Sequence, residues 1–179
     1  MKLHKCNMLK MTRFKILKLL AIILALGLCI PERGVIPVKN ATSKDWNSQS
    51  FWYAPWGKSG VHKGVDIFAK HGTPVIASTN GLVVYTGNIE MGGNVVAMLG
   101  PKWRIYYYAH LDSIHTHRLS WASRGELIGA VGSTGNAIGK PPHLHYSVLS
   151  LMPHPWRFST ETQGWKKLFF MNPMQELSE

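Results

Sequence analysis

Short apolar runs separated by turn residues fill the chain from residue 73 to residue 149. The first two runs, residues 75–78 and 82–85, flank Asn80-Gly81. Both residues of such a dipeptide accept the positive φ angles that a two-residue hairpin turn requires. The pattern therefore predicts an antiparallel hairpin at this point in the chain.

Further apolar runs extend the β pattern. Residues 94–99 and 104–109 flank a Gly-Pro-Lys turn and predict a second hairpin, while residues 127–131 and 144–149 predict two more strands. Residues 113–123 predict a loop with at most one helical turn. No helical period of more than about two turns occurs outside the N-terminal region. We therefore expect a mainly β fold, a small antiparallel β-sheet domain.

The N-terminal stretch has a different pattern. Residues 1–18 are basic, and an unbroken apolar run over residues 19–30 ends at Pro31. A basic region followed by a short apolar run is typical of a signal peptide, since spanning a bilayer takes about 20 apolar residues. The alternative is an uncleaved anchor formed by residues 14–30. Both interpretations of residues 1–30 predict export to the cell envelope, as a periplasmic, secreted or membrane-anchored protein.

Two further segments follow the N-terminal stretch. Residues 31–50 are polar, and this composition predicts a linker or a short pro-segment. Aromatic residues then cluster from Phe51 to Trp56, and a glycine-rich run follows them. This change predicts that one folded domain occupies residues 51–179.

Composition and charge are compatible with a folded domain of this kind. The chain is 45% hydrophobic and 16% charged, and its 17 glycines and 10 prolines favour a turn-rich β architecture. The formal net charge is +11, and without the basic residues of the N-terminal 29 it is +5. A moderately basic domain suits an anionic polymer such as bacterial wall material, but also an ordinary soluble protein. Both cysteines, Cys6 and Cys29, precede the predicted domain, which excludes disulfides and thiolate zinc sites from it.

Two histidines in the last predicted strand are the first candidates for chemistry. His143 and His145 are two residues apart, so in an extended segment their imidazoles point to one face, roughly 6–7 Å apart at the backbone. This spacing leaves room for one metal ligand and one neighbour. A His-x-His pair by itself is a weak signal, because exposed or hydrogen-bonded histidines are common.

A second candidate pair precedes the predicted sheet. Asp66 enters an apolar run, where a carboxylate must be paired, hydrogen-bonded or bound to a metal. In a fully extended chain His62 would lie roughly 13 Å from Asp66, too far to share an ion. Gly60 and Gly64 permit a bend that would bring the two side chains together. A capping aspartate beside an unrelated histidine is the alternative.

His110 ends a predicted strand that is rich in tyrosine. Strict alternation places Tyr106, Tyr108 and His110 on one face of this strand. Such an aromatic and polar face suits the wall of a groove, because in a core the phenols and the imidazole would each need a partner.

Together these residues have the composition of a catalytic zinc site. His62, Asp66 and either His143 or His145 would provide two nitrogens and one oxygen, with a fourth position open for water. Zinc would lower the pKa of that water, so the site could hydrolyse an amide. The chain has no His-Glu-x-x-His pair, so the remaining histidines are the natural candidates for the base.

Separated motifs in this chain resemble those of the M23 (lysostaphin-type, LytM-like) zinc endopeptidases, and the resemblance covers about residues 51–149. They occur in the family's order and spacing and are His62-x-x-x-Asp66, Tyr108-Ala109-His110-Leu111, the glycine-rich segment 125–136, and His143-Leu144-His145-Tyr146. Tyr146 and Ser147 depart from the Phe-Glu that often follows the second histidine. That position supports the site from outside it, so no ligand is lost.

The resemblance implies a small antiparallel β fold with a narrow groove that holds one zinc ion per chain. It implies that His62, Asp66 and His145 are the metal ligands, and that His110 and His143 are the unligated catalytic pair. The implied function is an exported zinc metalloendopeptidase that cleaves peptide bonds in peptidoglycan cross-links or bridges. The alternative is a non-catalytic module of the same fold that binds peptidoglycan or regulates an amidase.

The expected partners follow from these features. We expect peptidoglycan peptides as the substrate and a monomeric protein, with membrane contact only through an uncleaved N-terminal segment. A nucleic-acid partner is not expected, because the basic residues are scattered and an export signal is present.

Overall fold

The computed structural model describes the backbone of residues 2–175 and 177–178, and the side chains of residues 14–175 and of Leu177. Its one α-helix in this range is α1 (Lys2–Cys29). The strands are β1 (Gly34–Val35), β2 (Val65–Phe68), β3 (Pro74–Ile76), β4 (Gly81–Ile89), β5 (Gly93–Gly100), β6 (Arg104–Ile114), β7 (Trp121–Ala122), β8 (Leu127–Val131), β9 (His143–Ser150), β10 (Phe170–Met171) and β11 (Leu177–Ser178). Short 3₁₀ turns are η1 (Ser43–Asp45), η2 (Gly57–Ser59), η3 (Pro101–Trp103), η4 (Gly135–Ala137), η5 (Pro155–Arg157), η6 (Gly164–Leu168) and η7 (Pro173–Gln175).

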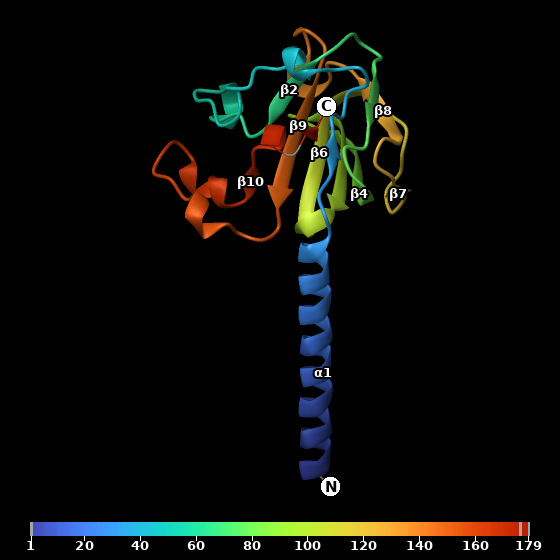
Figure 1. The fold of residues 1–179 in the computed structure, drawn as a ribbon, viewed down its shortest axis with the longest axis vertical. Coiled ribbons are helices and arrows are strands. Elements are labelled where there is room, and N and C mark those ends of the chain that lie inside the picture. The colour runs from blue at the N-terminus through green and yellow to red at the C-terminus, as the bar shows by residue number, and fades with distance from the viewer. Residues whose placement is uncertain (1, 176, 179) are drawn as a thin grey trace.

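One antiparallel sheet dominates the domain (Figure 1). Its strands run in the order β10-β9-β6-β5-β4-β7, while β2 also pairs with β9, and β8 pairs with both β3 and β6. The hairpin predicted around residues 100–102 is confirmed as the β5–β6 pair, and the strands predicted at 127–131 and 144–149 are confirmed as β8 and β9. The mainly β, antiparallel fold class is therefore confirmed.

The hairpin predicted at Asn80-Gly81 is wrong. β3 pairs with β8, whereas β4 pairs with β5 and β7, so the strands on either side of this dipeptide are not partners. A Cβ on Gly81 would lie 2.7 Å from the Leu99 carbonyl oxygen, and Asn80 Oδ1 accepts a hydrogen bond from Arg124 N at 2.7 Å. Gly81 thus allows β4 to pack closely against β5, and Asn80 binds the backbone of a loop distant in sequence. These long-range contacts outweigh the local turn preference of the two residues.

The segment from 113 to 123 contains more strand than expected. β6 continues to Ile114, and the two-residue strand β7 begins at Trp121. The intervening residues form a turn without a helical segment. The predicted loop is therefore wrong at both ends of the segment, where β6 pairs with β8 and β7 pairs with β4.

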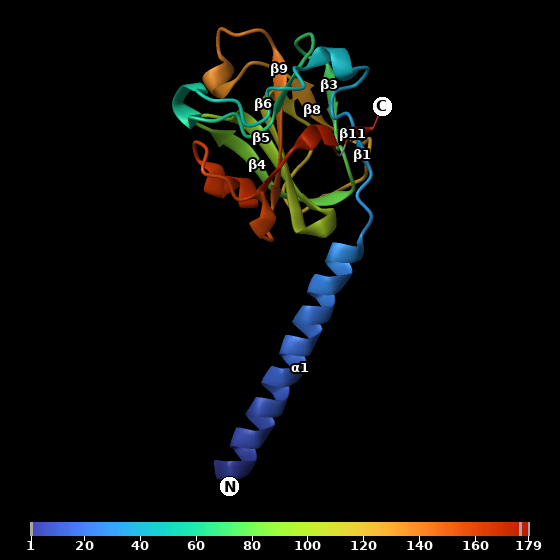
Figure 2. The ribbon, with the colours of Figure 1, turned by 60° about the vertical axis from the view of Figure 1, so that its left-hand side comes forward.

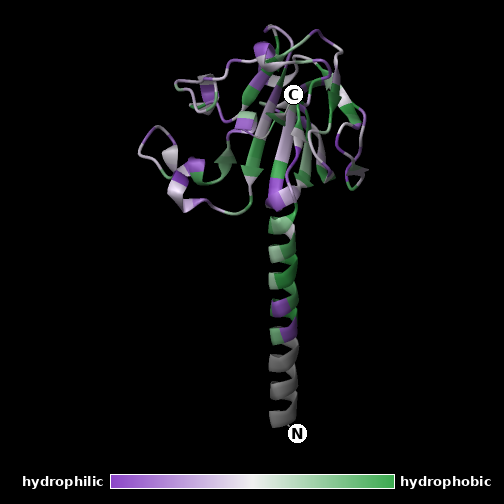
Figure 3. Ribbon diagram, in the orientation of Figure 1, coloured by the Kyte–Doolittle hydropathy of each residue, from purple (hydrophilic) through white to green (hydrophobic). Residues whose placement is uncertain are grey.

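Helix α1 extends away from the β domain (Figures 1 and 2). Its apolar stretch lies next to the domain (Figure 3), and side chains such as Leu20 and Leu26 are exposed. Trp103 Nε1 donates a hydrogen bond to Leu24 O at 2.9 Å, which links the helix to η3. Within the described part of the chain, no helix combines the length and apolarity that crossing a membrane requires.

Residues 31–50, expected to form a linker or pro-segment, lie against the domain. Ile36 and Val38 belong to the hydrophobic core, with 9% and 2% of their surfaces exposed. Strand β1 pairs with β11, and Val38 bridges Val75 of β3. The Glu32 carboxylate, nearly fully buried, contacts the Arg104 guanidinium. Apolar residues at the core therefore occur within a segment whose average composition is polar.

The segment after β9 leaves several aromatic side chains exposed. Trp156, Phe158 and Trp165 have 78%, 59% and 57% of their surfaces exposed. Phe170 lies in β10, pairs with Leu149 of β9 and lines the groove described below. Phe170 therefore helps to shape the groove.

Candidate metal centre

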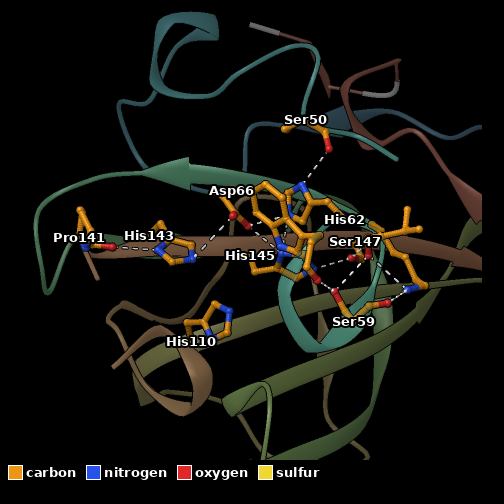
Figure 4. A network of polar contacts seen from close by, with 12 residues as sticks. Ser50, Ser59, His62, Asp66, His110, Pro141, His143, His145 and Ser147 are labelled. Carbon is orange, nitrogen blue, oxygen red and sulfur yellow. Dashed lines mark hydrogen bonds and ion pairs between the residues drawn. The ribbon is translucent and has the colours of Figure 1, made fainter. Parts of the chain in front are cut away.

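A groove of about 780 Å³ lies over β2, β6 and β9. Its walls are largely apolar and aromatic, and its charged and polar lining includes four histidines, one aspartate and three lysines. The five residues singled out from the sequence, His62, Asp66, His110, His143 and His145, all line this groove. The structure thus brings together side chains that are up to 83 positions apart in the chain (Figure 4).

β9 presents His143 and His145 to the groove. In its ladder with β2, His145 is opposite Asp66, and in its ladder with β6, His145 is opposite Ala109. Because residues two apart share a face, both imidazoles point into the groove, while Leu144 and Tyr146 between and after them are buried in the core. Strand register therefore places one carboxylate beside one imidazole.

The chain bends between His62 and Asp66, as their predicted proximity requires. β2 begins only at Val65, and His62 Nε2 lies 3.0 Å from Asp66 Oδ1. Gly60 has a φ of +73° at the end of η2. Gly64 acts by its size instead, because a Cβ there would lie 2.4 Å from Ser147 Oγ and 2.5 Å from Tyr146 O. The absence of a side chain lets this segment approach β9 closely.

The face predicted for β6 is wrong, and a bulge explains the difference. His110 has a φ of +63°, and the β5–β6 register shifts at this point. Strict alternation would put His110 with Tyr106 and Tyr108, but those tyrosines are buried in the core, with 1% and 0% exposed. The bulge turns His110 to the opposite face, where it lines the groove together with Tyr107.

Each imidazole has one nitrogen held by an acceptor outside the cluster. His62 Nδ1 lies 3.0 Å from Ser50 O, His143 Nδ1 2.8 Å from Pro141 O, and His110 Nδ1 2.9 Å from Thr134 O. A carbonyl oxygen only accepts, so each of these Nδ1 atoms carries the hydrogen, and in the neutral ring Nε2 keeps a lone pair.

His145 is held in the opposite sense. Ser147 Oγ donates to Lys63 O at 3.0 Å and lies 3.0 Å from His145 Nε2. Since the hydroxyl hydrogen is already used, Ser147 accepts from His145 Nε2–H, which leaves the lone pair of His145 on Nδ1.

The lone pairs of His62 and His145 meet at the Asp66 carboxylate. His62 Nε2, Asp66 Oδ1 and His145 Nδ1 form a triangle. His62 Nε2 lies 3.0 Å from Asp66 Oδ1 and 3.2 Å from His145 Nδ1, and His145 Nδ1 lies 2.7 Å from Asp66 Oδ1. Among the described residues, these are the group of potential ligands whose donor atoms lie within 4.8 Å of one another. Ligands about 2.0–2.1 Å from a tetrahedral zinc lie about 3.3 Å apart, close to these separations.

This donor set fits a divalent cation. In the assigned neutral tautomers, no hydrogen lies between the atoms of the triangle, so they repel one another unless a positive charge joins them. Two imidazolium ions in contact would repel each other in turn, and His62 is only 1% exposed. A metal ion bound by two neutral imidazoles and one carboxylate removes both difficulties.

The titration behaviour of the cluster agrees with this assignment. Burial lowers the pKa of His145, so its neutral form is favoured. Burial by itself would raise the pKa of Asp66, but hydrogen bonds and positive charge from His145 and His62 bring that pKa below the usual range when those rings are protonated. A cation bound in the triangle would supply the same positive charge with both rings neutral, so the carboxylate is ionised in either case. Neutral imidazole and ionised carboxylate are the forms that bind metals.

His110 and His143 stand beside the triangle. His143 Nε2 lies 3.9 Å from Asp66 Oδ2, and the ring centroids of His110 and His143 are 5.0 Å apart. Burial, together with the neighbouring His145 and His143, lowers the pKa of His110 to about 4. His110 is therefore neutral near pH 7 and can accept a proton at Nε2.

Several groups that hold the site residues in place were not predicted from the sequence. Ser50, Thr134 and Pro141 act through backbone carbonyls, which any residue possesses. Trp56 stacks on His62 with ring centroids 4.2 Å apart, although the sequence placed it only in an aromatic cluster. Tyr146 Oη lies 2.7 Å from Ser78 Oγ, so the phenol that departs from the family pattern has a buried partner.

A groove on an antiparallel sheet holds a His-Asp-His triangle that could bind a metal ion, with two further histidines beside it. The family model for peptidase family M23 matches residues 60–154, and the chain belongs to this family. The resemblance seen in the motifs is therefore confirmed.

Comparison with known proteins agrees with this classification. The peptidoglycan DD-endopeptidase ShyA of Vibrio cholerae is 39% identical over 88 residues, which make up 49% of this chain and 20% of that protein. This chain therefore spans about a fifth of that relative's length. The catalytic domain of the antimicrobial peptidase lysostaphin from Staphylococcus simulans superposes with a TM-score of 0.59 and 26% identity, covering 76% of this chain and 97% of that domain. A zinc-containing peptidase from Vibrio cholerae superposes with a TM-score of 0.51 and 27% identity, covering 65% of this chain and 35% of that protein.

Proposed function

We propose that this chain is a zinc metalloendopeptidase, exported by residues 1–30, that hydrolyses peptide bonds in bacterial peptidoglycan cross-links or bridges. The observation that carries the proposal is the triangle of His62 Nε2, Asp66 Oδ1 and His145 Nδ1. The acceptors Ser50 O and Ser147 Oγ on the other ring nitrogens assign tautomers whose lone pairs face one another. Its relatives support the substrate class, since ShyA is named as a peptidoglycan endopeptidase. Residues 51–179 are proposed as the peptidase domain, acting as a monomer on peptidoglycan peptides.

Three of the five site residues would bind the metal ion, and the other two would transfer protons. His62, Asp66 and His145 would hold one zinc ion, which when bound supplies Lewis-acid activation of water and of the substrate carbonyl. His110 and His143 each keep Nδ1–H on a carbonyl, so each can take a proton at Nε2 and pass it to the leaving amine. Apolar walls such as Tyr107 and Phe170 would limit water around the reacting bond.

Variants of the two β9 histidines test the proposal. We expect wild-type protein to hold about one zinc per chain, in line with one three-ligand site. His143→Ala should retain that zinc and lose catalysis, whereas His145→Ala should lose both, because only His145 belongs to the triangle. The zinc content of each protein would be measured by inductively coupled plasma mass spectrometry. Cleavage would be measured by mass spectrometry of the muropeptides released from purified sacculi. His117→Ala, an exposed histidine outside the groove, serves as the matched control.

The alternative is a non-catalytic module of this fold that binds peptidoglycan or regulates an amidase. Such a module would bind sacculi without releasing new amino groups. Retention of all five site residues in one groove favours the enzyme. A wild-type protein that holds no zinc, or that binds sacculi without cutting them, would contradict the proposed activity.

A further inference from the structure

The groove around the metal centre is positively charged. Its described lining includes three lysines, Lys58, Lys63 and Lys140, and one carboxylate, Asp66. Asp66 lies in the triangle and faces His62 and His145, so its charge is already engaged. The lysines are therefore opposed by no other acid among the described residues that line the groove.

Two of these lysines belong to segments that contact different histidines of the cluster. Lys58 belongs to η2, two residues after Trp56, which stacks on His62. Lys140 precedes Pro141, whose carbonyl oxygen holds His143. Figure 4 shows Ser59 and Pro141, the neighbours of these lysines, on opposite sides of the histidine and aspartate side chains. A peptide lying across the triangle would thus pass a segment that carries a groove-lining lysine on each side.

Further positive charge strengthens the end near Ser59. Lys63 Nζ donates to Ser59 O at 3.0 Å and to Val61 O at 3.2 Å, which holds this ammonium at the groove wall. Lys166 lies close enough to act electrostatically on Lys63. Gln163, which accepts from Lys166, donates to Ser59 O at 2.8 Å, so these residues form one connected cluster.

We propose that this groove selects acidic peptides, in which residues on both sides of the cleaved bond carry free carboxylates. This inference rests on the proposed function and deepens it. A peptide without acidic groups, such as a run of glycines, gains nothing from Lys58 and Lys140, whereas a carboxylate on either side gains a charge-assisted hydrogen bond. A low-dielectric apolar wall makes such attraction stronger than it would be in water.

Matched synthetic peptides test this inference with the zinc-loaded full-length protein. One peptide carries free side-chain carboxylates on both sides of the cleaved bond, a second carries the corresponding carboxamides, and a third has only its C-terminal carboxylate converted to an amide. We expect the acidic peptide to have the highest kcat/KM, and its advantage to shrink between about 50 mM and about 500 mM salt. The third peptide distinguishes side-chain from terminal carboxylates as the source of the effect.

Charge-removing variants locate the effect. Lys58→Gln and Lys140→Gln should each reduce the preference for the acidic peptide about two- to fivefold, the range of one exposed ion pair. Lys44→Gln removes an exposed lysine that does not line the groove and should leave the preference unchanged. Thermal unfolding of each variant would confirm that the fold is retained.

Binding of the same peptides, followed by calorimetry, separates this inference from the proposed activity. Equal cleavage of the acidic and amidated peptides, or an unchanged preference in both groove variants, would overturn the inference and leave the activity standing. Preferential binding of the acidic peptide without cleavage of any peptide would support the inference and contradict the activity.

Discussion

At the scale of single residues, orientation of the imidazoles depends on groups around the candidate metal centre. A serine hydroxyl does for His145 what backbone carbonyls do for the other three histidines. Ser147 is 5% exposed, and its Oγ has two partners, Lys63 O and His145 Nε2. Such outer partners fix the tautomer and direction of a ligand, and their loss typically lowers metal affinity 10–100-fold.

Ser147→Ala should therefore lower zinc affinity about tenfold, because His145 Nε2–H loses its acceptor and the ring loses its fixed tautomer. Competition with a chelator of known zinc affinity would measure the change without relying on activity. Ser150→Ala is the matched control, since Ser150 is a buried serine of the same strand that contacts Met152 and His154. Unchanged zinc affinity in Ser147→Ala would contradict the role of this hydroxyl.

At the scale of elements, three irregularities build the site on an otherwise regular sheet. The bulge in β6 turns His110 into the groove, the bend before β2 brings His62 to Asp66, and a glycine allows β2 to approach β9. His143 and His145 lie two residues apart on the regular strand β9, so their shared face was predictable from the sequence. The irregular positions depend on contacts between strands that are distant in sequence.

Gly64→Ala should disrupt the proposed metal centre, because the added methyl group would collide with β9. The added Cβ would meet Ser147 Oγ, Tyr146 O and His145 Cε1 at 2.4, 2.5 and 3.0 Å, so β2 must move away from β9. We expect unfolding free energy to fall by about 1–3 kcal/mol and zinc affinity to fall with it, because Asp66 is opposite His145 in this ladder. Urea unfolding and a zinc titration would measure both effects.

Gly125→Ala provides the control for this prediction. Gly125 has a φ of +86° and open space around its Cα, so a Cβ there strains only the backbone, by about 1–2 kcal/mol. Both variants should therefore lose stability, but only Gly64→Ala should lose zinc affinity. Equal zinc affinities in the two variants would show that β2 tolerates a side chain at this point.

At the scale of the whole molecule, the segment between α1 and the aromatic cluster completes the core. Ile36 and Val38 pack against it, and Val35 N donates to Ser78 O at 2.9 Å. Ile76 N in turn donates to Pro37 O at 2.9 Å. The segment thus adds buried apolar surface and backbone hydrogen bonds to the edge of the sheet at β3.

Two truncated proteins test this contribution. A protein of residues 32–179 should unfold like the full chain, because it keeps the packed segment. A protein of residues 51–179 should lose about 3–6 kcal/mol, from two buried aliphatic side chains at about 1.5–3 kcal/mol each. Urea unfolding of both proteins would measure the difference. Equal stabilities would mean that residues 32–50 add nothing to the folded domain.

The sequence by itself determined the fold class and the chemical inventory. Most strands were predictable from apolar runs, because burial of alternate side chains imposes a local pattern that does not depend on the partner strand. The identities of His62, Asp66, His110, His143 and His145 as candidates followed from residue type and spacing. The shared face of His143 and His145 followed from strand geometry alone.

Only the tertiary structure decided how those candidates are arranged. Residue spacing left His143 and His145 as equal candidates for the third ligand, and the β2–β9 register puts His145 in the triangle. Alternation misplaced His110, because a bulge requires a register shift against β5. Asn80-Gly81 misled because long-range pairing replaced a local turn. Each of these outcomes depends on contacts between segments far apart in the chain, and a local pattern contains no information about them.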